Sequence, residues 1–419
     1  MKKGVMAIVV LFVAIGLLTS FSYAQEAEKA VINTISERIE ITGELETGFW
    51  VDSMGRKGIS GRTEDTEFQL TTAALAVDAK VTDWIDVTVV PMFEVEEFFV
   101  DEGHVTIGPT DTIPVYFTAG LLYFPFGKRE EYTHFPDEPL VNLPATLYLG
   151  EIWDPGFVAG ITKEIPFAGL SHKITIEAFG VYPKVTDSSG NRQLDNFGFN
   201  VCYNLSGDEY KFEIGGSYIN NVLNSRGIKD FFADQEIMEI AGVGVLTGPL
   251  THRGFEYKRF DGPAWDGKIR TERDVDAVAA YMSAEYKNFY LTAEYMGVTE
   301  PIRNFYWEGS NVPLVTLTDS EGKRLHPHVW GVEIGAGLED YLTLPVPVEA
   351  MFRYEGSIEA QPIYGIPRNR WAIGLNVGIY KYATWSLAYA YSDYDPDYTQ
   401  YNDNRTNRNL FFSQIAIKF

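Results

Sequence analysis

The last thirteen residues of the chain, Asn407 to Phe419, alternate between two kinds of side chain. The largely apolar face consists of Phe411, Ser413, Ile415, Ile417 and Phe419, and the opposite face of Phe412, Gln414, Ala416 and Lys418. Alternation with period two predicts a β-strand with one apolar face. Its aromatic end is typical of a strand at the rim of a membrane barrel. The alternative is the last edge strand of a soluble sandwich.

The same alternation recurs along the chain. In the first instance Ile39, Ile41, Leu45 and Phe49 share one face, while Glu40, Thr42, Glu44 and Glu46 share the other. We predict sixteen strands, at residues 37–51, 66–80, 84–96, 99–108, 114–127, 157–167, 172–182, 196–206, 209–220, 275–286, 289–298, 328–341, 345–356, 370–382, 383–393 and 407–419.

The connections between these strands alternate in length. Short turns, such as those at 82–83 and 287–288, occupy one end, and 97–98 is the exception at the other. Long connections occupy that other end at 52–65, 128–156, 183–195, 221–274, 299–327, 357–369 and 394–406. An even number of strands with short turns at one end and long loops at the other is typical of an outer-membrane barrel. The sequence therefore predicts an all-β, transmembrane, antiparallel, up-and-down β-barrel over 37–419.

The N-terminus adds an expectation about location. Lys2 and Lys3 precede an apolar run from Gly4 to Leu18, and small residues follow up to Ala24. This order is typical of a cleavable signal peptide at 1–24. Residues 25–36 then form a short periplasmic segment, and both termini of the barrel are expected in the periplasm of a bacterial cell. After residue 24, no apolar run approaches the ~20 residues that a membrane helix needs.

Composition excludes some classes of protein. The chain has 58 acidic and 34 basic residues, for a net charge of −24, which argues against nucleic-acid binding. The single cysteine, Cys202, excludes an internal disulfide framework. Aromatic residues make up 14% while mean hydropathy is only −0.11, as expected when an apolar lipid face and a polar lumen average out.

If the apolar face meets lipid, the polar face lines the lumen. A barrel of sixteen strands is wide enough to leave an aqueous channel. The acidic residues expected there outnumber the basic ones, so we expect a preference for cations or neutral solutes over anions. The predicted pore-lining residues are Glu40, Glu44, Glu46, Glu94, Glu96, Glu177, Glu213, Glu285, Glu294, Glu333, Glu349 and Glu355, with Lys173, Lys211, Arg353 and Arg370.

Two long loops carry further expectations. The segment 128–156 is rich in proline and partly apolar, so we predict that it folds into the barrel and constricts the channel; packing on the outer rim is the alternative. Lys128, Arg129, Glu130 and Glu131 mark its root. The segment 221–274 contains many basic residues. We expect it to form an extracellular hairpin or a partial lid whose basic residues meet anionic ligands or lipopolysaccharide phosphates; a solvated loop is the alternative.

The sequence gives little indication of catalysis. It contains no His-Glu-x-x-His pattern and no glycine-rich phosphate loop. His326 and His328 are only two of the three or four ligands that a transition metal usually needs, so no metal or cofactor is predicted. We predict that the protein is not an enzyme, with an outer-membrane barrel enzyme or adhesin with a filled lumen as the alternative.

The stretch Ala119-Gly120-Leu121-Leu122-Tyr123-Phe124-Pro125-Phe126-Gly127 resembles the LbtU-like siderophore porin family, which is similar in layout to the phosphate-selective porin O/P group. Asp137-Glu138-Pro139-Leu140 and Leu149-Gly150-Glu151 also fit that pattern. The resemblance implies a sixteen-stranded outer-membrane channel that admits iron–siderophore complexes. The chain departs from it because 25–36 is too short for the coiled coil that family members often carry before the barrel.

Together these features predict a porin for small polar solutes, with an iron–siderophore complex as the solute that the resemblance implies. Outer-membrane lipid and lipopolysaccharide are its expected surroundings. The sequence leaves the oligomeric state open, and a homotrimer is a common arrangement of porins.

Overall fold

The computed structural model describes residues 38–57, 60–94, 97–108, 114–128, 144–167, 169–182, 194–228, 235–240, 243–249, 269–307, 313–315, 323–361, 365–395 and 405–419. The signal peptide expected at 1–24 and the segment 25–36 lie outside these residues. Among the described residues, no helix is long and apolar enough to cross a lipid bilayer.

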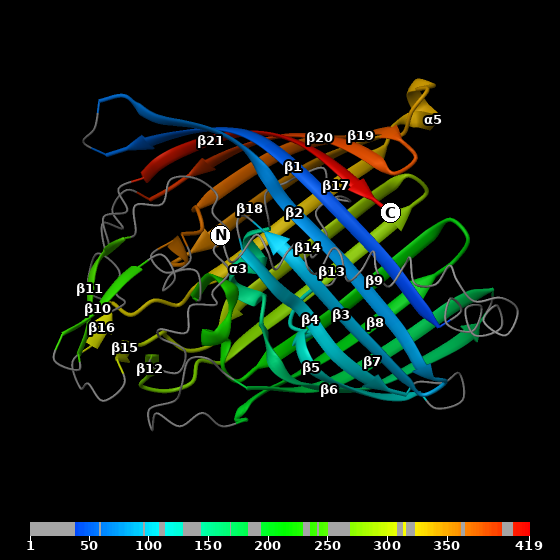
Figure 1. The fold of residues 1–419 in the computed structure, drawn as a ribbon, viewed down its shortest axis with the longest axis horizontal. Helices are drawn as coiled ribbons and strands as arrows, with labels where there is room; N and C mark the ends of the chain where they lie inside the picture. The colour runs from blue at the N-terminus through cyan, green and yellow to red at the C-terminus, as the bar shows by residue number, and fades with distance from the viewer. Residues whose placement is uncertain are drawn as a thin grey trace, which may run out of the picture.

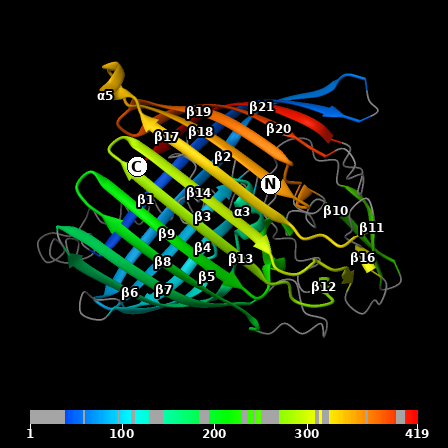
Figure 2. The same cartoon turned by 180° about the vertical axis from the view of Figure 1, so that it is seen from behind.

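Sixteen of the described strands form one closed antiparallel barrel (Figures 1 and 2). They are β1 (Ile39–Arg56), β2 (Arg62–Thr82), β3 (Ile85–Glu94), β4 (Glu97–Ile107), β5 (Val115–Tyr123), β6 (Trp153–Phe167), β7 (Leu170–Val181), β8 (Asn196–Ser206), β9 (Tyr210–Ile219), β13 (Ala277–Tyr286), β14 (Phe289–Val298), β17 (His328–Gly337), β18 (Val348–Ile358), β19 (Asn369–Tyr380), β20 (Ala383–Asp393) and β21 (Arg405–Lys418). This confirms the predicted fold class.

The barrel closes where the last strand pairs with the first. β21 runs antiparallel to β1, from Glu44 opposite Lys418 to Arg56 opposite Arg405. The amide of Gly43 donates to the Phe419 carbonyl at 2.8 Å, and the Phe419 amide donates back at 2.9 Å. Closure therefore leaves no sheet edge unpaired at this seam, as a strand protein in lipid requires.

The outer surface of the barrel is apolar because alternate side chains along each strand point outward. On β21, Phe411, Ile415 and Ile417 are exposed, whereas Phe412, Gln414 and Ala416 are buried. Ile334 on β17 and Ile373 on β19 follow the same rule beside the buried Glu333 and Ala372. Exposed apolar residues on this scale are expected where the solvent is lipid.

Aromatic residues also lie on the outer surface near both ends of the strands. His328 accepts or donates a 2.8 Å hydrogen bond with Tyr295 near the long loops, and His172 does the same with Tyr203 near the short turns. Such amphipathic rings suit the level of lipid headgroups. Trp50, by contrast, points inward, is 2% exposed and stacks on Phe412 with ring centres 5.7 Å apart.

Some predicted boundaries were wrong. The loop expected at 52–65 is mostly strand, because β1 and β2 continue as a hairpin to Arg56 and from Arg62. β6 begins at Trp153 and not at residue 157, so it pairs with β5 as far as Tyr123. The loop predicted at 128–156 therefore ends at residue 152, four residues earlier than predicted.

The long connections contain structure of their own. In 221–274, β10 (Gln235–Ile240) pairs with β11 (Val243–Pro249). β12 (Ile269–Thr271) joins β15 (Phe305–Trp307) and β16 (Pro313–Val315) in a three-stranded sheet. Both sheets lie at one end of the barrel, and α5 (Glu339–Leu342), in the β17–β18 connection, lies at the other (Figure 1). We call these the long-loop end and the short-turn end.

Candidate functional site: the inner wall and the segment docked on it

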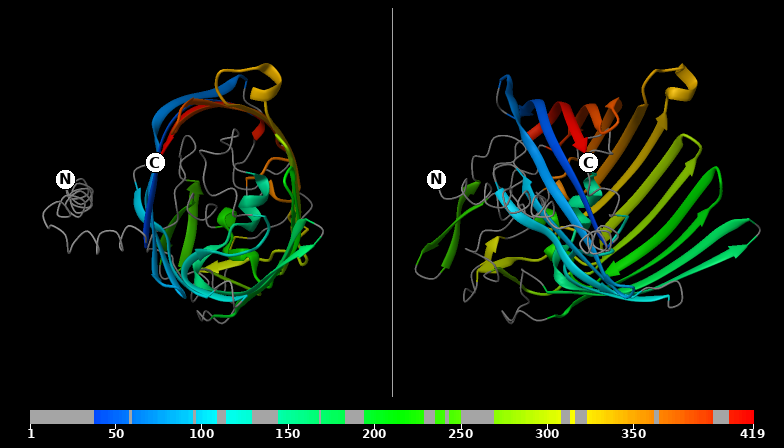
Figure 3. Two further views of the ribbon diagram at one scale, coloured as in Figure 1. Left: turned by 90° about the vertical axis from the view of Figure 1, so that its right-hand side faces the viewer. Right: turned by 45° about the vertical axis from the view of Figure 1, so that its right-hand side comes forward.

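A short helix, α3 (Ala145–Gly150), lies within the ring of strands (Figure 3, left, teal). It is the described core of the predicted constriction segment, and it contacts the inner side of β14, β17 and β18. Ala145, Leu147 and Leu149 are buried. Apolar side chains of the helix are therefore removed from water inside the barrel, which stabilises the docked position.

The root of the segment and the helix meet at one carboxylate. Glu294 on β14 accepts a hydrogen bond from the backbone amide of Lys128 at 2.7 Å and another from the Thr146 hydroxyl at 2.6 Å. The amide of Gly127 donates to the Ser217 hydroxyl at 2.7 Å, and the Lys128 ammonium lies 3.7 Å from Glu213. Charge-assisted hydrogen bonds of this kind are among the stronger ones in proteins.

A second carboxylate holds the start of the helix. Glu355 on β18 accepts from the backbone amide of Ala145 and from the Arg370 guanidinium at 2.5 Å. Beside it, Arg353 pairs with Glu333 at 2.5 Å, and all four charged side chains are buried. Since each buried charge has an opposite charge as partner, the wall under α3 is locally close to neutral.

The far side of the segment is also attached. The Glu151 carboxylate lies 3.2 Å from the Arg226 guanidinium, and the Arg226 amide donates to the Glu151 carbonyl at 2.8 Å. Around these contacts an apolar core fills the lumen between β5 and β17; it includes Phe124, Phe126 and Phe179. The described part of the segment, Lys128 and residues 144–152, therefore packs inside the barrel in the manner of a protein core.

A separate polar network crosses the inner wall from β5 to β13. Glu177 accepts from the Tyr116 hydroxyl and from the Asn200 amide at 2.9 Å. The Tyr281 hydroxyl donates to Asn200 at 3.3 Å, and its ring lies flat against Gly215, where a Cβ would come within 2.3 Å of the ring. This wall is rigid, because its polar side chains bond to one another across four strands.

The inner wall carries buried residues on every side. Each of the sixteen described barrel strands has an inward-facing residue that is less than 9% exposed. One from each strand, in order, is Trp50, Thr72, Met92, Phe99, Leu122, Val158, Phe179, Asn200, Ser217, Ala279, Glu294, Glu333, Arg353, Arg370, Ser386 and Gln414. The wall of a wide aqueous pore would be exposed, so other side chains cover the wall at these positions.

Toward the short-turn end the inner wall opens. Glu40, Lys80 and Asp86 are exposed, as are Lys211 and Glu285, whose charged groups lie 2.8 Å apart. The interior therefore has two parts. One is a filled half toward the long loops, and the other is a solvent-accessible vestibule toward the short turns.

The predicted pore-lining residues are distributed between these two parts. Those that are buried in the filled half are Glu46, Glu294, Glu333, Glu355, Arg353 and Arg370. Those that are half-buried are Glu44, Glu177, Glu213 and Glu349, and those that are exposed are Glu40, Glu285, Lys173 and Lys211. Glu94 lies in β3 but nothing is described of its side chain, and Glu96, Arg129, Glu130 and Glu131 lie outside the described residues.

Sequence reasoning missed several residues of the site. Ser217, Thr146 and Arg226 hold the constriction segment, and Asn200 and Tyr281 build the second network. For Ser217, Asn200 and Tyr281 the sequence signal is alternation with outward apolar residues, which many other positions share, whereas Thr146 and Arg226 lie outside the strands and have no such signal. Within the described part of the chain, no group of three or more histidine, cysteine or acidic side chains is placed to hold a metal ion.

No known family model matches this chain. It is 25% identical over 305 residues, or 73% of its length, to UPF0422 protein lpg2959 of Legionella pneumophila. It is 25% identical over 151 residues, or 35% of its length, to a UPF0422 protein of Coxiella burnetii, 30% of which is covered. The chain spans about half the length of the Legionella relatives.

Solved structures that align with the chain include porins. The chain aligns over 91% of its length with an anion-selective porin from Comamonas acidovorans, covering 99% of that chain at 8% identity and a TM-score of 0.49. It aligns over 91% with OmpF of Salmonella typhi, covering 97% at 11% identity and a TM-score of 0.48. At these values the similarity is one of general fold, and the architecture rests on the strand pairing of the chain itself.

Proposed function

We propose that the protein is an outer-membrane channel for small polar solutes, in which the segment 128–156 narrows the lumen. The observation that carries the proposal is the docking of Gly127, Lys128 and α3 on the inner wall of a closed barrel with an apolar outer surface. An open vestibule leads to this point from the short turns. Such an arrangement sets pore size while the barrel itself stays rigid.

Planar lipid bilayers test the proposal directly. Purified protein should give stepwise conductance. The steps should be small because α3 and the residues packed around it lie within the lumen. Replacing 125–151 by a short turn between β5 and β6 should enlarge the steps, since Tyr123 and Trp153 already pair at that point. A protein without any conductance would instead fit the alternative of a barrel enzyme or adhesin with a filled lumen.

The charge preference of the channel is a further part of the proposal. The vestibule exposes Glu40, Asp86 and Glu285 against Lys80 and Lys211, and the chain as a whole carries a net charge of −24. We therefore expect cations and neutral solutes to pass more readily than anions. Reversal potentials measured in a salt gradient decide this, and anion preference would refute it.

We also propose a natural solute and an oligomeric state for the channel. The resemblance at Ala119–Gly127 suggests an iron–siderophore complex, which uptake of labelled iron by cells with and without the gene would test. The basic residues of 221–274 suit lipopolysaccharide phosphates. A homotrimer is the assembly that we expect, and native mass spectrometry in detergent measures it.

A further inference from the structure

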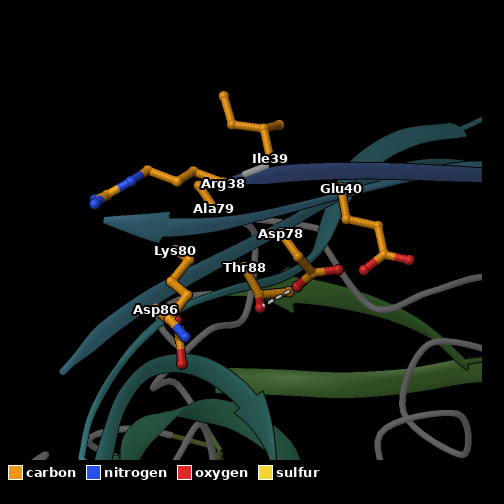
Figure 4. Close-up of a pocket in the computed structure, with 8 residues that line it drawn as sticks. All are labelled: Arg38, Ile39, Glu40, Asp78, Ala79, Lys80, Asp86 and Thr88. Atoms are coloured by element: carbon orange, nitrogen blue, oxygen red, sulfur yellow. Dashed lines mark hydrogen bonds between the residues drawn. The ribbon is translucent and has the colours of Figure 1, made fainter. Parts of the chain in front are cut away.

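The vestibule contains a cavity of about 600 Å³ in the inner wall formed by β1, β2 and β3 (Figure 4). Its polar lining consists of Arg38, Glu40, Asp78, Lys80, Asp86 and Thr88. The volume falls within the range of ~300–1,000 Å³ typical of small-molecule sites. It lies on the route that solutes would take, and it plays no part in holding the constriction segment.

The negative charges of the cavity lie side by side. Glu40 on β1 is directly opposite Asp78 on β2. Thr88, on β3, is opposite Asp78 in turn, and its hydroxyl donates to the Asp78 carboxylate at 2.6 Å. Like charges directly opposite on paired strands are destabilising. A repulsive pair in an otherwise regular sheet is the kind of local conflict that functional sites retain.

The positive charges form the neighbouring row, nearer the short-turn end. The Lys80 amide donates to the Arg38 carbonyl at 2.7 Å, so these two residues are also side by side. Asp86 on β3 is opposite Lys80. The Arg38 guanidinium also donates to the Val81 carbonyl at 3.0 Å. The wall thus presents two basic residues and Asp86 at the mouth and a negative pair one step deeper.

The spacing of the two rows indicates the size of a matching ligand. Arg38 lies just before β1, two residues from Glu40, and Lys80 is two residues from Asp78 on β2, so the backbone positions of the two rows are ~7 Å apart. An extended dipeptide has its ammonium and carboxylate at a comparable separation, because each residue spans ~3.4 Å. A single ion would be attracted by the charges of one row and repelled by those of the other.

We propose that this cavity binds a zwitterionic solute of dipeptide size, with its ammonium at Glu40 and Asp78 and its carboxylate at Arg38 and Lys80. The inference names a solute class for the proposed channel and in that sense rests on it. Binding itself needs only the cavity. The two ideas are therefore separable by experiment.

Isothermal titration of the full chain in detergent tests the proposal, with glycylglycine as the probe and ethylamine and acetate as single-charge comparisons. Glycylglycine should bind saturably and more tightly than either comparison. The double variant Glu40→Gln, Asp78→Asn should weaken binding at least ~10-fold, since a hydrogen bond to a charged group contributes ~1.5–3 kcal/mol. Lys80→Met should weaken glycylglycine while leaving ethylamine unchanged.

Glu209→Gln is the matched control, because Glu209 is an exposed acid at the same end whose partner, Lys287, lies 3.7 Å away outside the cavity. It should bind glycylglycine as the unmodified protein does. Equal binding of ethylamine and glycylglycine, an unchanged double variant, or no saturation by ~100 mM would each overturn the proposal. Conductance without saturable binding would refute only the proposal that the cavity binds this ligand. Binding without conductance would refute only the proposal that the protein is a channel.

Discussion

The attachment of the constriction segment to Glu294 provides the most direct test of how the lumen is narrowed. Glu294 accepts from the Lys128 amide at 2.7 Å and from the Thr146 hydroxyl at 2.6 Å, and it is 7% exposed. In the variant Glu294→Gln the side chain keeps its size, but one of its two acceptors becomes an NH₂ donor. That donor then faces a donor of the segment.

The magnitude follows from the number of bonds. A hydrogen bond to a charged group contributes ~1.5–3 kcal/mol, so losing one of the two should weaken docking by about 2 kcal/mol. Because 1.4 kcal/mol is a factor of ten, the undocked population should rise ~30-fold. Thr146→Val removes only the hydroxyl donor and should act in the same direction by a smaller amount.

Single-channel recording in planar bilayers measures the effect. Glu294→Gln should show larger or more frequent open steps than the unmodified protein. Glu285→Gln is the control, because Glu285 lies in the same wall but is 47% exposed and pairs with Lys211 at 2.8 Å. If Glu294→Gln conducts like both the control and the unmodified protein, Glu294 does not hold the constriction and the reasoning is refuted.

Two further predictions concern stability. Arg353→Met should lower the free energy of unfolding by ~3–5 kcal/mol in urea titrations, since it leaves the buried Glu333 carboxylate without its guanidinium partner; an unchanged midpoint would contradict a buried pair. Glu272 follows β12 in the three-stranded sheet of β12, β15 and β16. The hydrogen bond from Tyr306 and the charge of Arg303 hold the pKa of Glu272 below its usual range. This carboxylate therefore stabilises the sheet at pH values above the ordinary Glu pKa and ceases to do so as pH falls through the lowered pKa. Hydrogen exchange at β12 should therefore quicken at acid pH, and Glu272→Gln should remove that dependence; a variant that keeps it would refute the assignment.

The strands and their two faces were predictable because lipid and lumen impose a period of two on every strand. The number of strands followed from this alternation and from the alternating loop lengths. The contacts of the constriction segment were not predictable, because Lys128 and Glu294 are 166 residues apart and meet only through the accumulated register of the sheet. The inward position of Trp50 follows from the alternation, because it shares a face with Glu44 and Glu46, but its stacking on Phe412 of the last strand was not predictable for the same reason.

The pairing of charges also changes which residues can set ion selectivity. The sequence suggests glutamates throughout the lumen, but Glu333 and Glu355 are neutralised by Arg353 and Arg370 in the filled half. A buried ion pair presents little net field to a passing solute, whereas exposed carboxylates in the vestibule do. Selectivity should therefore be decided before the constriction is reached, where Glu40 and its neighbours face water.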